Sequence, residues 1–347
     1  MRKLITTTLI IRFSSVGDII LTTPLLRVLR RSFPSSRIDF LVKSEYTPLL
    51  KDNPHLSRVI PLPPGDGFRA LLELRSRVAR EGYDMVVDLH DSLRSRAICA
   101  GHPRVYRVKK RKIARFTLVR FKRDLYNRFG GAPGVAERYL ETIRHLGVVD
   151  DQEGTELFPS SSDHEAAEKL IPPMPRQWIG LCPAARHATK MWPADRFARA
   201  GAELALGLGS GVLLMGGPED VDLCNAVERD MELLGRDFTV VNSAGRLTLL
   251  QCAALMDHCA VVIANDSGLM HVAAARKRPV VALFGSTVRQ FGFVPYGTRS
   301  VVVERPDVRC RPCTHIGRAS CPEGHFRCMN EITIDQVVGA VSSLLVE

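Results

Sequence analysis

The sequence lacks the glycine-rich fingerprints of the common nucleotide-binding folds. No GxGxxG motif follows a strand-like run, and no GxxxxGK[ST] motif occurs in the 347 residues. The glycine-rich segment 207–211 lies between a predicted helix and a predicted strand, the wrong order for a dinucleotide site, so we interpret it as a helix C-cap and turn. These absences argue against a dehydrogenase and against a P-loop ATPase.

Long apolar runs are also missing. No stretch of roughly 18 apolar residues occurs, which argues against a membrane-spanning helix. The chain starts with two cations and an apolar stretch but has no small-residue cleavage site, so we interpret residues 4–13 as a first β-strand and not as a signal peptide. The composition, 45% apolar, is typical of a globular protein, and we expect it to remain in the cytoplasm.

Acidic residues are nearly absent from the segment 104–128. It contains eleven Lys and Arg residues against one acid, Asp124, so it carries nearly all of the net charge of +11. Such a concentration of charge attracts phosphate groups, acidic lipid surfaces or nucleic acid. Its apolar residues are suited to anchor it to the fold or to a membrane surface. A solvated basic loop and helix is the alternative.

Strand-like apolar runs alternate with helical periodicity in both halves of the chain. This βαβ pattern is typical of a parallel sheet covered by helices. Ser- and Pro-rich stretches within residues 158–177 interrupt the pattern and indicate a domain junction. The sequence therefore predicts an α/β protein of two Rossmann-like doubly wound domains, residues 1–170 and 171–332, and a C-terminal helix within 333–347.

Two Gly/Asp turns follow buried strands, one near each end of the chain: Ser14-Ser15-Val16-Gly17-Asp18 and Asn265-Asp266-Ser267-Gly268. At such strand-to-helix turns, backbone N–H groups approach ligands closely and the helix N-terminus carries partial positive charge. Open α/β sheets bind ligands at this edge, so Asp18 is either a helix cap or a catalytic base. We expect Asp266 either to cap the helix or to orient a hydroxyl or a lysine, and His271 either to reach the cleft or to lie in the core.

Three further strand-end loops carry polar side chains. The loop 183–193 combines Arg, His, Thr and Lys side chains, which suits a diphosphate, although an ordinary basic loop has the same composition. The turn 216–220 ends in two acids that either bind ribose hydroxyls or cap the turn. Arg94 and Arg96 follow the strand that ends at Leu89 and add two cations.

Four of the nine cysteines are close together near the C-terminus. Their spacing, with two residues between the first pair, fits a tetrahedral zinc site formed by Cys310, Cys313, Cys321 and Cys328. Free thiols are the alternative, and disulfides are disfavoured in a cytosolic protein.

The segments SSVGDIILTTPLLRVLR, TKMWPADRFA, LLMGGPED and NDSGLMHVAAA, with PVVALFGST, resemble the glycosyltransferase family 9 heptosyltransferases. The resemblance covers nearly the whole chain. It implies a GT-B fold, in which two Rossmann-like domains face a cleft. In that family the C-terminal domain binds the ADP-heptose donor and the N-terminal domain binds the acceptor, the inner core of lipopolysaccharide. The final helix is expected to pack back on the first domain.

The same resemblance implies roles for individual residues. Asp18 would be the general base, and Lys190 would neutralise the leaving diphosphate. Adenosine would lie near Asn242 and Ser243, and the ribose near one of three acids, Glu219, Asp220 and Asp222. The remaining donor contacts would come from Ser14, Ser15, Gly17, Thr189, Asp266, Ser267, Gly268, Leu269 and His271. Catalysis would need no metal, because fixed donors replace it.

The implied function is inverting transfer of heptose from ADP-L-glycero-D-manno-heptose to the lipopolysaccharide inner core. Arg94 and Arg96 would contact anionic groups of the Kdo/heptose acceptor, and the enzyme would work at the inner face of the cytoplasmic membrane without nucleic acid. Two alternatives stay open: a GT-B transferase with another nucleotide-sugar or acceptor, and a non-catalytic zinc-knuckle protein that binds nucleic acid. The second leaves Asp18, Lys190 and Asp266 without a role.

Overall fold

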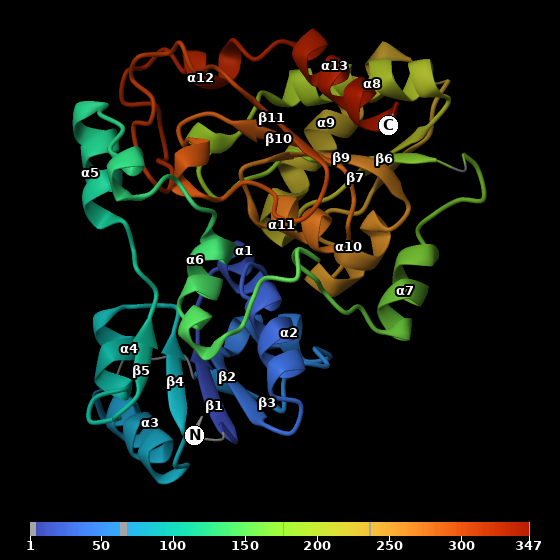
Figure 1. Ribbon diagram of the computed structural model, residues 1–347. Helices are drawn as coiled ribbons and strands as arrows, with labels where there is room; N and C mark the ends of the chain where they lie inside the picture. The colour runs from blue at the N-terminus through green and yellow to red at the C-terminus, as the bar shows by residue number, and fades with distance from the viewer. Residues whose placement is uncertain (1–4, 63–67, 176, 236, 347) are drawn as a thin grey trace. The chain divides into compact units, whose positions relative to one another are not determined.

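Two all-parallel β-sheets organise the chain in the computed structural model, which describes residues 5–62, 68–175, 177–235 and 237–346 (Figure 1). Each sheet forms the centre of its own folding unit. Unit 1 contains the chain up to Lys110 together with Val135–Phe158, and unit 2 contains Arg111–Gly134 together with the chain from Pro159 onward. The main junction falls at Phe158, within the Ser- and Pro-rich region that the sequence indicated.

Unit 1 has the strand order β3-β2-β1-β4-β5. Its strands are β1 (Thr7–Ile11), β2 (Arg37–Lys43), β3 (Arg58–Leu62), β4 (Met85–Asp88) and β5 (Val105–Arg107). Its α-helices are α1 (Val16–Ile20), α2 (Thr23–Ser32), α3 (Phe68–Arg80), α4 (Leu93–Ile98) and α6 (Val135–Glu141), with 3-10 turns at Ser44–Leu50 and Arg144–Leu146. The central strand β1 is buried from Thr8 to Ile11, as expected for a parallel sheet that helices cover on both faces.

Unit 2 has the order β11-β10-β9-β6-β7-β8, which is the Rossmann arrangement. Its strands are β6 (Trp178–Cys182), β7 (Gly211–Leu214), β8 (Val240–Asn242), β9 (Cys259–Asn265), β10 (Val280–Phe284) and β11 (Ser300–Glu304). Its α-helices are α5 (Lys112–Phe121), α7 (Ser161–Glu168), α8 (Ala194–Leu208), α9 (Val221–Leu234), α10 (Leu249–Met256), α11 (Gly268–Ala275), α12 (Arg327–Asn330) and α13 (Ile334–Leu345). Short 3-10 turns cover Tyr126–Phe129, Ala188–Lys190, Pro218–Asp220 and Arg289–Phe291.

Two segments belong to a different unit from the one expected. The helix α13 buries Val337, Val341 and Leu344 in the core of unit 2, so it covers its own sheet and does not return to the first domain as expected. The segment 111–134 was expected in the first domain but is part of unit 2. It is held there because Ala114 and Leu118 of α5 are buried in one apolar cluster with unit 2 residues.

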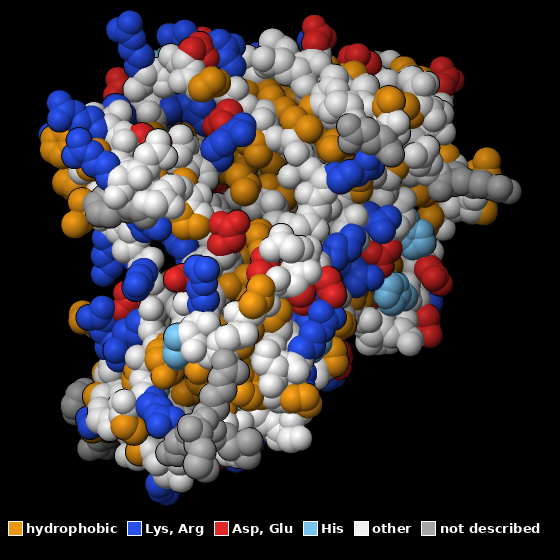
Figure 2. Space-filling model, viewed as in Figure 1, with side chains coloured by type: hydrophobic (Ala, Val, Ile, Leu, Met, Phe, Trp, Pro, Cys, Tyr) orange, Lys and Arg blue, Asp and Glu red, His pale blue; other side chains and the backbone are white. Residues whose placement is uncertain are grey.

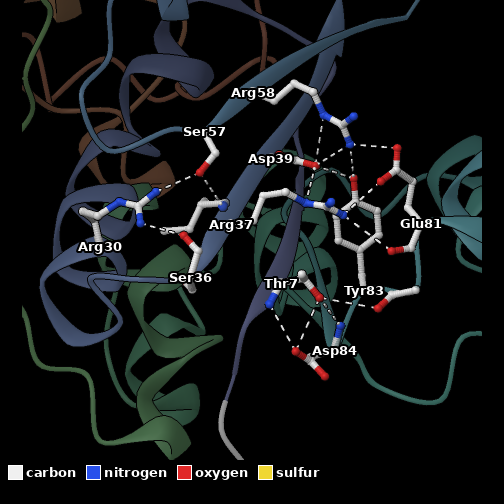
Figure 3. A network of polar contacts seen from close by, with 12 residues as sticks. Thr7, Arg30, Ser36, Arg37, Asp39, Ser57, Arg58, Glu81, Tyr83 and Asp84 are labelled. Carbon is white, nitrogen blue, oxygen red and sulfur yellow. Dashed lines mark hydrogen bonds and ion pairs between the residues drawn. The ribbon is translucent and has the colours of Figure 1, made fainter.

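A charged network holds the amino-terminal edge of the first sheet together (Figure 3). Asp39 of β2 is fully buried, and its Oδ2 accepts hydrogen bonds from the Tyr83 hydroxyl at 2.7 Å and from Arg58 Nη2 at 2.7 Å. Arg37 and Arg58 also pair with Glu81. Burial, and then the bond to Asp39, raise the pKa of Tyr83 to about 12. Ligands bind at the opposite, carboxyl edge of such sheets, so this network is structural.

We expect Asp39→Asn to lower the free energy of unfolding by about 2 kcal/mol, because it removes the charge that Arg37 and Arg58 share. This loss of stability is smaller than that for a fully buried ion pair, because both arginine side chains are 38% exposed and solvent screens their charge. Thermal unfolding of the variant measures it. The exposed Asp52→Asn is the matched control, and an unchanged melting temperature for Asp39→Asn would show that the network adds nothing to stability.

Candidate active site

The candidate site residues follow the strands at the switch point of each sheet. In unit 1 the switch point lies between β1 and β4, and in unit 2 between β6 and β9, because the chain leaves these neighbouring strands in opposite directions. In open α/β folds a crevice at the carboxyl ends of such strands binds the ligand. Asp18 follows β1, Lys190 follows β6 and Asp266 follows β9.

In unit 1, Asp18 is held by an arginine that bridges the two switch-point strands. Arg12 Nη2 lies 2.6 Å from Asp18 Oδ1. The same guanidinium donates to the carbonyls of Ser14 and Leu89, each at 2.8 Å, and so ties the loop after β1 to the end of β4. The other carboxylate oxygen, Oδ2, accepts from the backbone N–H of Ser15 at 3.2 Å and from its hydroxyl at 3.0 Å.

This geometry shows the capping role of Asp18, and the role of catalytic base stays a prediction. Ser15 is the N-cap of α1, and Asp18 closes a capping box with its Oδ2. Oδ1, which pairs with Arg12, also accepts from the Tyr139 hydroxyl of α6 at 3.4 Å. Burial alone would raise the pKa of Asp18, but Arg12 and the Ser15 donors outweigh it, so the pKa lies below its usual value. The carboxyl group is therefore ionised at neutral pH.

A histidine and the predicted acceptor arginines lie on the β4 side of the same site. The His90 ring packs 4.6 Å from the Phe13 ring. Burial, with Arg12 and Lys110 nearby, lowers the pKa of His90 to about 3, so the ring is neutral. Arg94 is close enough to His90 to contribute to this shift. Arg96 is 55% exposed and pairs with Asp91 at 2.7 Å.

In unit 2, three switch-point loops meet at one carboxylate. Lys190 Nζ lies 2.7 Å from Asp266 Oδ2, and the Thr287 hydroxyl, from the loop after β10, donates to the same oxygen at 2.6 Å. Asp266 thus orients both a lysine and a hydroxyl, as expected from its charge. Only 14% of the Lys190 side chain and 7% of the Asp266 side chain are exposed, so solvent screens this pair weakly.

Backbone and hydroxyl donors surround this pair. Ser267 is the N-cap of α11, and its buried hydroxyl has no hydrogen-bond partner among the described residues. The first turn of α11 also leaves N–H groups without intrahelical acceptors. Thr189 is buried, and its hydroxyl accepts from the N–H of Arg318 at 2.8 Å and from the Ser286 hydroxyl at 3.1 Å. Together these groups form a seat for an anion, as at other helix N-termini.

Two residues of this region have structural roles. The Ser243 hydroxyl is fully buried and donates to the Leu214 carbonyl at 2.8 Å, so it is not placed to contact adenosine as expected. His271 is 4% exposed and lies edge-on to Phe293, which favours the core alternative.

Asn242 lines a cavity of about 820 Å³ along the edge strand β8. Its amide donates to Asn225 at 2.9 Å and to Glu228 at 2.8 Å, and its oxygen accepts from the N–H of Ala244. None of the residues of the Lys190 seat lines this cavity.

The three acids proposed for ribose differ in their surroundings. Asp220 Oδ2 accepts from the Gly217 N–H at 2.8 Å and so closes the turn after β7. Burial raises the pKa of Asp220 above its usual value. Glu219 and Asp222 are exposed to solvent. The capped-turn alternative therefore describes Asp220, and the other two acids stay accessible to a ligand.

The possible zinc site of the four C-terminal cysteines stays a prediction. All four are free thiols, and no group of three or more His, Cys, Asp or Glu side chains is placed to hold a metal ion in the part of the chain that the structure describes. Cys310 Sγ lies 3.8 Å from His325 Nε2. Burial raises the pKa of Cys328 to about 11, and the other three thiols lie near enough to raise it as well.

Comparisons with known proteins agree with this geometry. The sequence profile of Glycosyltransferase family 9 (heptosyltransferase) matches residues 71–322, well over half of the chain. The chain belongs to glycosyltransferase family 9. It is therefore a glycosyltransferase, as the motifs indicated.

The chain is similar to proteins of this family over their full length. It is 28% identical to lipooligosaccharide heptosyltransferase 2 of Haemophilus ducreyi, covering 97% of this chain and 99% of the relative. It is 30% identical to lipooligosaccharide heptosyltransferase 2 of Haemophilus influenzae, covering 82% and 84%. The solved structure of the E. coli ADP-heptose lipopolysaccharide heptosyltransferase II matches with a TM-score of 0.71 at 24% identity, covering 98% of this chain and 99% of that one. The expected α/β fold of GT-B type is confirmed.

Sequence reasoning missed Arg12, Tyr139 and Thr287. Arg12 did leave a signal, because it is the one charged residue in the apolar run 8–13. Thr287 ends a motif that was singled out, yet no role was assigned to it. Tyr139 is 121 residues from Asp18 in the chain, and nothing in the sequence connects the two.

Proposed function

We propose that this glycosyltransferase moves heptose from ADP-L-glycero-D-manno-heptose to the inner core of lipopolysaccharide with inversion at the anomeric carbon. One observation carries the proposal: the switch-point loops of each unit hold a weakly exposed ion pair that fixes the position of its charged groups. The loops of unit 1 hold an ionised carboxylate, and those of unit 2 hold a lysine beside an unpartnered hydroxyl and a helix N-terminus. A glycosyl transfer between an alcohol and a nucleoside diphosphate-sugar needs both groups.

Asp18 acts as the general base. Its Oδ1 accepts the proton of the acceptor hydroxyl as that oxygen forms a bond to the anomeric carbon. The bond from the anomeric carbon to the diphosphate breaks, and ADP leaves with the electron pair. Because Arg12 lowers the pKa of Asp18, the carboxylate is a weak base. Proton transfer therefore occurs late, after the sugar has developed oxocarbenium character.

Lys190 stabilises the negative charge that grows on the leaving diphosphate. Asp266 and the loop geometry hold the ammonium group in place, so it does not have to reorganise during the reaction. The Ser267 hydroxyl and the N–H groups of the first turn of α11 supply further donors. These fixed donors stabilise the charge on the leaving diphosphate in place of a metal ion. We therefore expect turnover to be unaffected by a chelator.

The acceptor binds to unit 1 in this proposal, and nucleic acid is not a substrate. Arg94 and Arg96 extend from the loop and helix after β4, on the Asp18 side of the sheet, and carry the positive charge that suits the carboxylates and phosphates of the inner core. No helix in the described part of the chain has the length and apolar character needed to cross a bilayer. We propose that the enzyme works as a peripheral protein on the cytoplasmic face of the inner membrane, where its lipid-linked acceptor is exposed.

An assay of ADP release tests the function. Purified protein is incubated with ADP-heptose and with either Kdo-lipid A or heptosyl-Kdo-lipid A, and the product is analysed by mass spectrometry. The proposal predicts acceptor-dependent ADP release and one added heptosyl residue on one of the two acceptors. Transfer from a different nucleotide-sugar in preference to ADP-heptose, or ADP release without a glycosylated product, would contradict it.

We expect Arg12→Met to change the pH dependence of the reaction. Without the guanidinium, burial dominates and the pKa of Asp18 rises. The base must be ionised, so activity falls at pH values below the new pKa. Protonation of Asp18 should therefore not reduce the activity of the wild type between about pH 5 and 8. The activity of the variant should fall toward the acidic end of that range.

The profile of kcat/KM against pH measures this shift. Arg31→Met is the matched control, because Arg31 pairs with Asp151 and Glu153 on the outer side of unit 1 and not with Asp18. A profile for Arg12→Met that runs parallel to that of the wild type would show that Arg12 does not set the protonation of the base.

A further inference from the structure

The helix α5 is attached to the loop that carries part of the anion seat. Its inner residues Ala114 and Leu118 are buried in a cluster with Val288 and Phe291. Val288 follows directly on Thr287, the partner of Asp266, and Phe291 ends the short turn that comes next. At its end, Lys122 Nζ donates to the Pro312 carbonyl at 2.7 Å, a second tie to unit 2. One face of α5 is therefore fixed to the carboxyl edge of the second sheet.

The opposite face of α5 exposes large apolar side chains. Ile113 is 66% exposed, Phe116 61% and Phe121 57%. The rings of Phe116 and Phe121 contact each other edge-on at 6.0 Å on this surface. Three such residues within ten positions exceed the scattered single apolar residues that a protein surface normally shows.

Cations surround these apolar residues. Lys112, Arg120 and Arg123 are exposed, Arg115 is half-buried, and none of the four forms an ion pair within the described ranges of the chain. On a helical wheel of α5, Lys112 and Arg120 lie in the same sector as Ile113 and Phe116. Figure 2 shows apolar and cationic side chains intermixed on the surface over this helix.

We propose that the outer face of α5 docks unit 2 on an anionic phospholipid bilayer. The aromatic and aliphatic side chains enter the boundary between headgroups and acyl chains, and the flanking Lys and Arg contact lipid phosphates. Aromatic residues on one face and cations around them are the pattern of interfacial helices. The local charge, eleven cations to one acid over 104–128, favours an acidic surface over a neutral one.

The inference rests on the proposed function only for the reason why the protein would dock on a membrane. Docking through α5 would hold the anion seat, one loop away, close to the surface from which a lipid-linked acceptor projects. Lipid binding itself does not require heptose transfer, so the two statements can fail separately.

Vesicle binding of the full-length protein tests the proposal. Sedimentation with phosphatidylcholine vesicles, with and without phosphatidylglycerol, measures the bound fraction. We expect binding only with phosphatidylglycerol, and weakening by added salt. Two double variants should each lower the partition coefficient at least tenfold: Ile113→Ser/Phe116→Ser and Lys112→Glu/Arg120→Glu. The first removes apolar area that enters the bilayer. The second reverses two charges, and each charge near an acidic surface contributes about fivefold.

Matched controls come from α9 in the same unit. Leu233→Ser removes an apolar side chain that is 85% exposed, and Arg229→Glu reverses an exposed charge. Both should bind vesicles like the wild type. A Phe116→Trp variant adds a direct probe, because its fluorescence should shift to the blue on phosphatidylglycerol vesicles if the side chain enters the bilayer.

Activity with a water-soluble acceptor fragment shows that the variants are folded and separates this proposal from the proposed function. The α5 variants should keep their turnover on the soluble acceptor and lose it on the vesicle-bound acceptor. Equal vesicle binding by the wild type and the α5 variants would overturn the docking proposal. Binding to single-stranded RNA but not to vesicles would overturn it as well. Absence of heptose transfer with intact vesicle binding would overturn only the proposed function.

Discussion

Replacement of Asp18 by asparagine is expected to lower kcat by roughly 10²–10⁴-fold, the range that general-base catalysis contributes. Asparagine keeps the shape of the side chain, and its one carbonyl oxygen can still accept from Ser15 and keep the capping box, while its NH2 group replaces the oxygen that pairs with Arg12. What is lost is the negative oxygen that receives the acceptor proton. The dissociation constant for ADP should stay within about twofold, because the residues proposed to bind the diphosphate all belong to unit 2.

Two measurements make this prediction specific. Thermal unfolding of Asp18→Asn should resemble that of the wild type, which shows that the capping box survives. Tyr139→Phe serves as a neighbouring control, since it removes a hydroxyl at 3.4 Å from Oδ1 but leaves the base, and its turnover should stay within a few-fold of the wild type. A loss of less than tenfold for Asp18→Asn, with ADP binding intact, would refute the role of general base.

Lys190→Met is expected to slow the departure of the diphosphate and to weaken the binding of ADP. Removing one fixed donor from a site of developing charge typically costs 10²–10³-fold in kcat, and we expect a loss of this order here. The affinity for ADP should fall as well, on the order of tenfold or more, because the lysine also pairs with the bound phosphates. Lys190→Met therefore differs from Asp18→Asn, which should leave ADP binding intact.

The lysine variant leaves the buried Asp266 without its cation and could therefore be misfolded. A second variant of the same site controls for this. Ser267→Ala removes an unpartnered hydroxyl from the same seat without creating an unpaired charge, and it should lower the affinity for ADP several-fold. Arg186→Met, an exposed cation in the same loop, should have little effect. If ADP binds equally well to Lys190→Met, Ser267→Ala and the wild type, the diphosphate is not bound at this switch point.

Much of the fold could be predicted because parallel sheets buried on both faces leave continuous apolar runs in the sequence. The strands Trp178–Cys182 and Val280–Phe284 are examples, since both have nearly unbroken apolar sequences and both are buried at every position. The ends of the strands then locate the candidate site, since the loops that follow them at the switch point carry Asp18, Lys190 and Asp266. This much follows from local patterns alone.

The packing of separate segments could not be predicted in the same way. The helix α13 has an apolar face that would suit either unit, and only the tertiary structure shows that Val337 and Val341 fill the core of unit 2. The four C-terminal cysteines have zinc-like spacing, yet spacing does not fix the direction of each side chain. Arg12 and Tyr139 reach Asp18 from a strand end and from a distant helix, and these contacts depend on how the chain folds back on itself.

The anomeric configuration of the product tests the central claim most directly, because the account assigns Asp18 to proton removal in a single displacement. Nuclear magnetic resonance of the purified glycosylated acceptor reports whether the new glycosidic bond has the configuration of the donor or the opposite one. The account predicts the opposite configuration in all of the product. Retention of the donor's configuration would contradict it, since retention requires a route other than direct attack by a hydroxyl that Asp18 deprotonates.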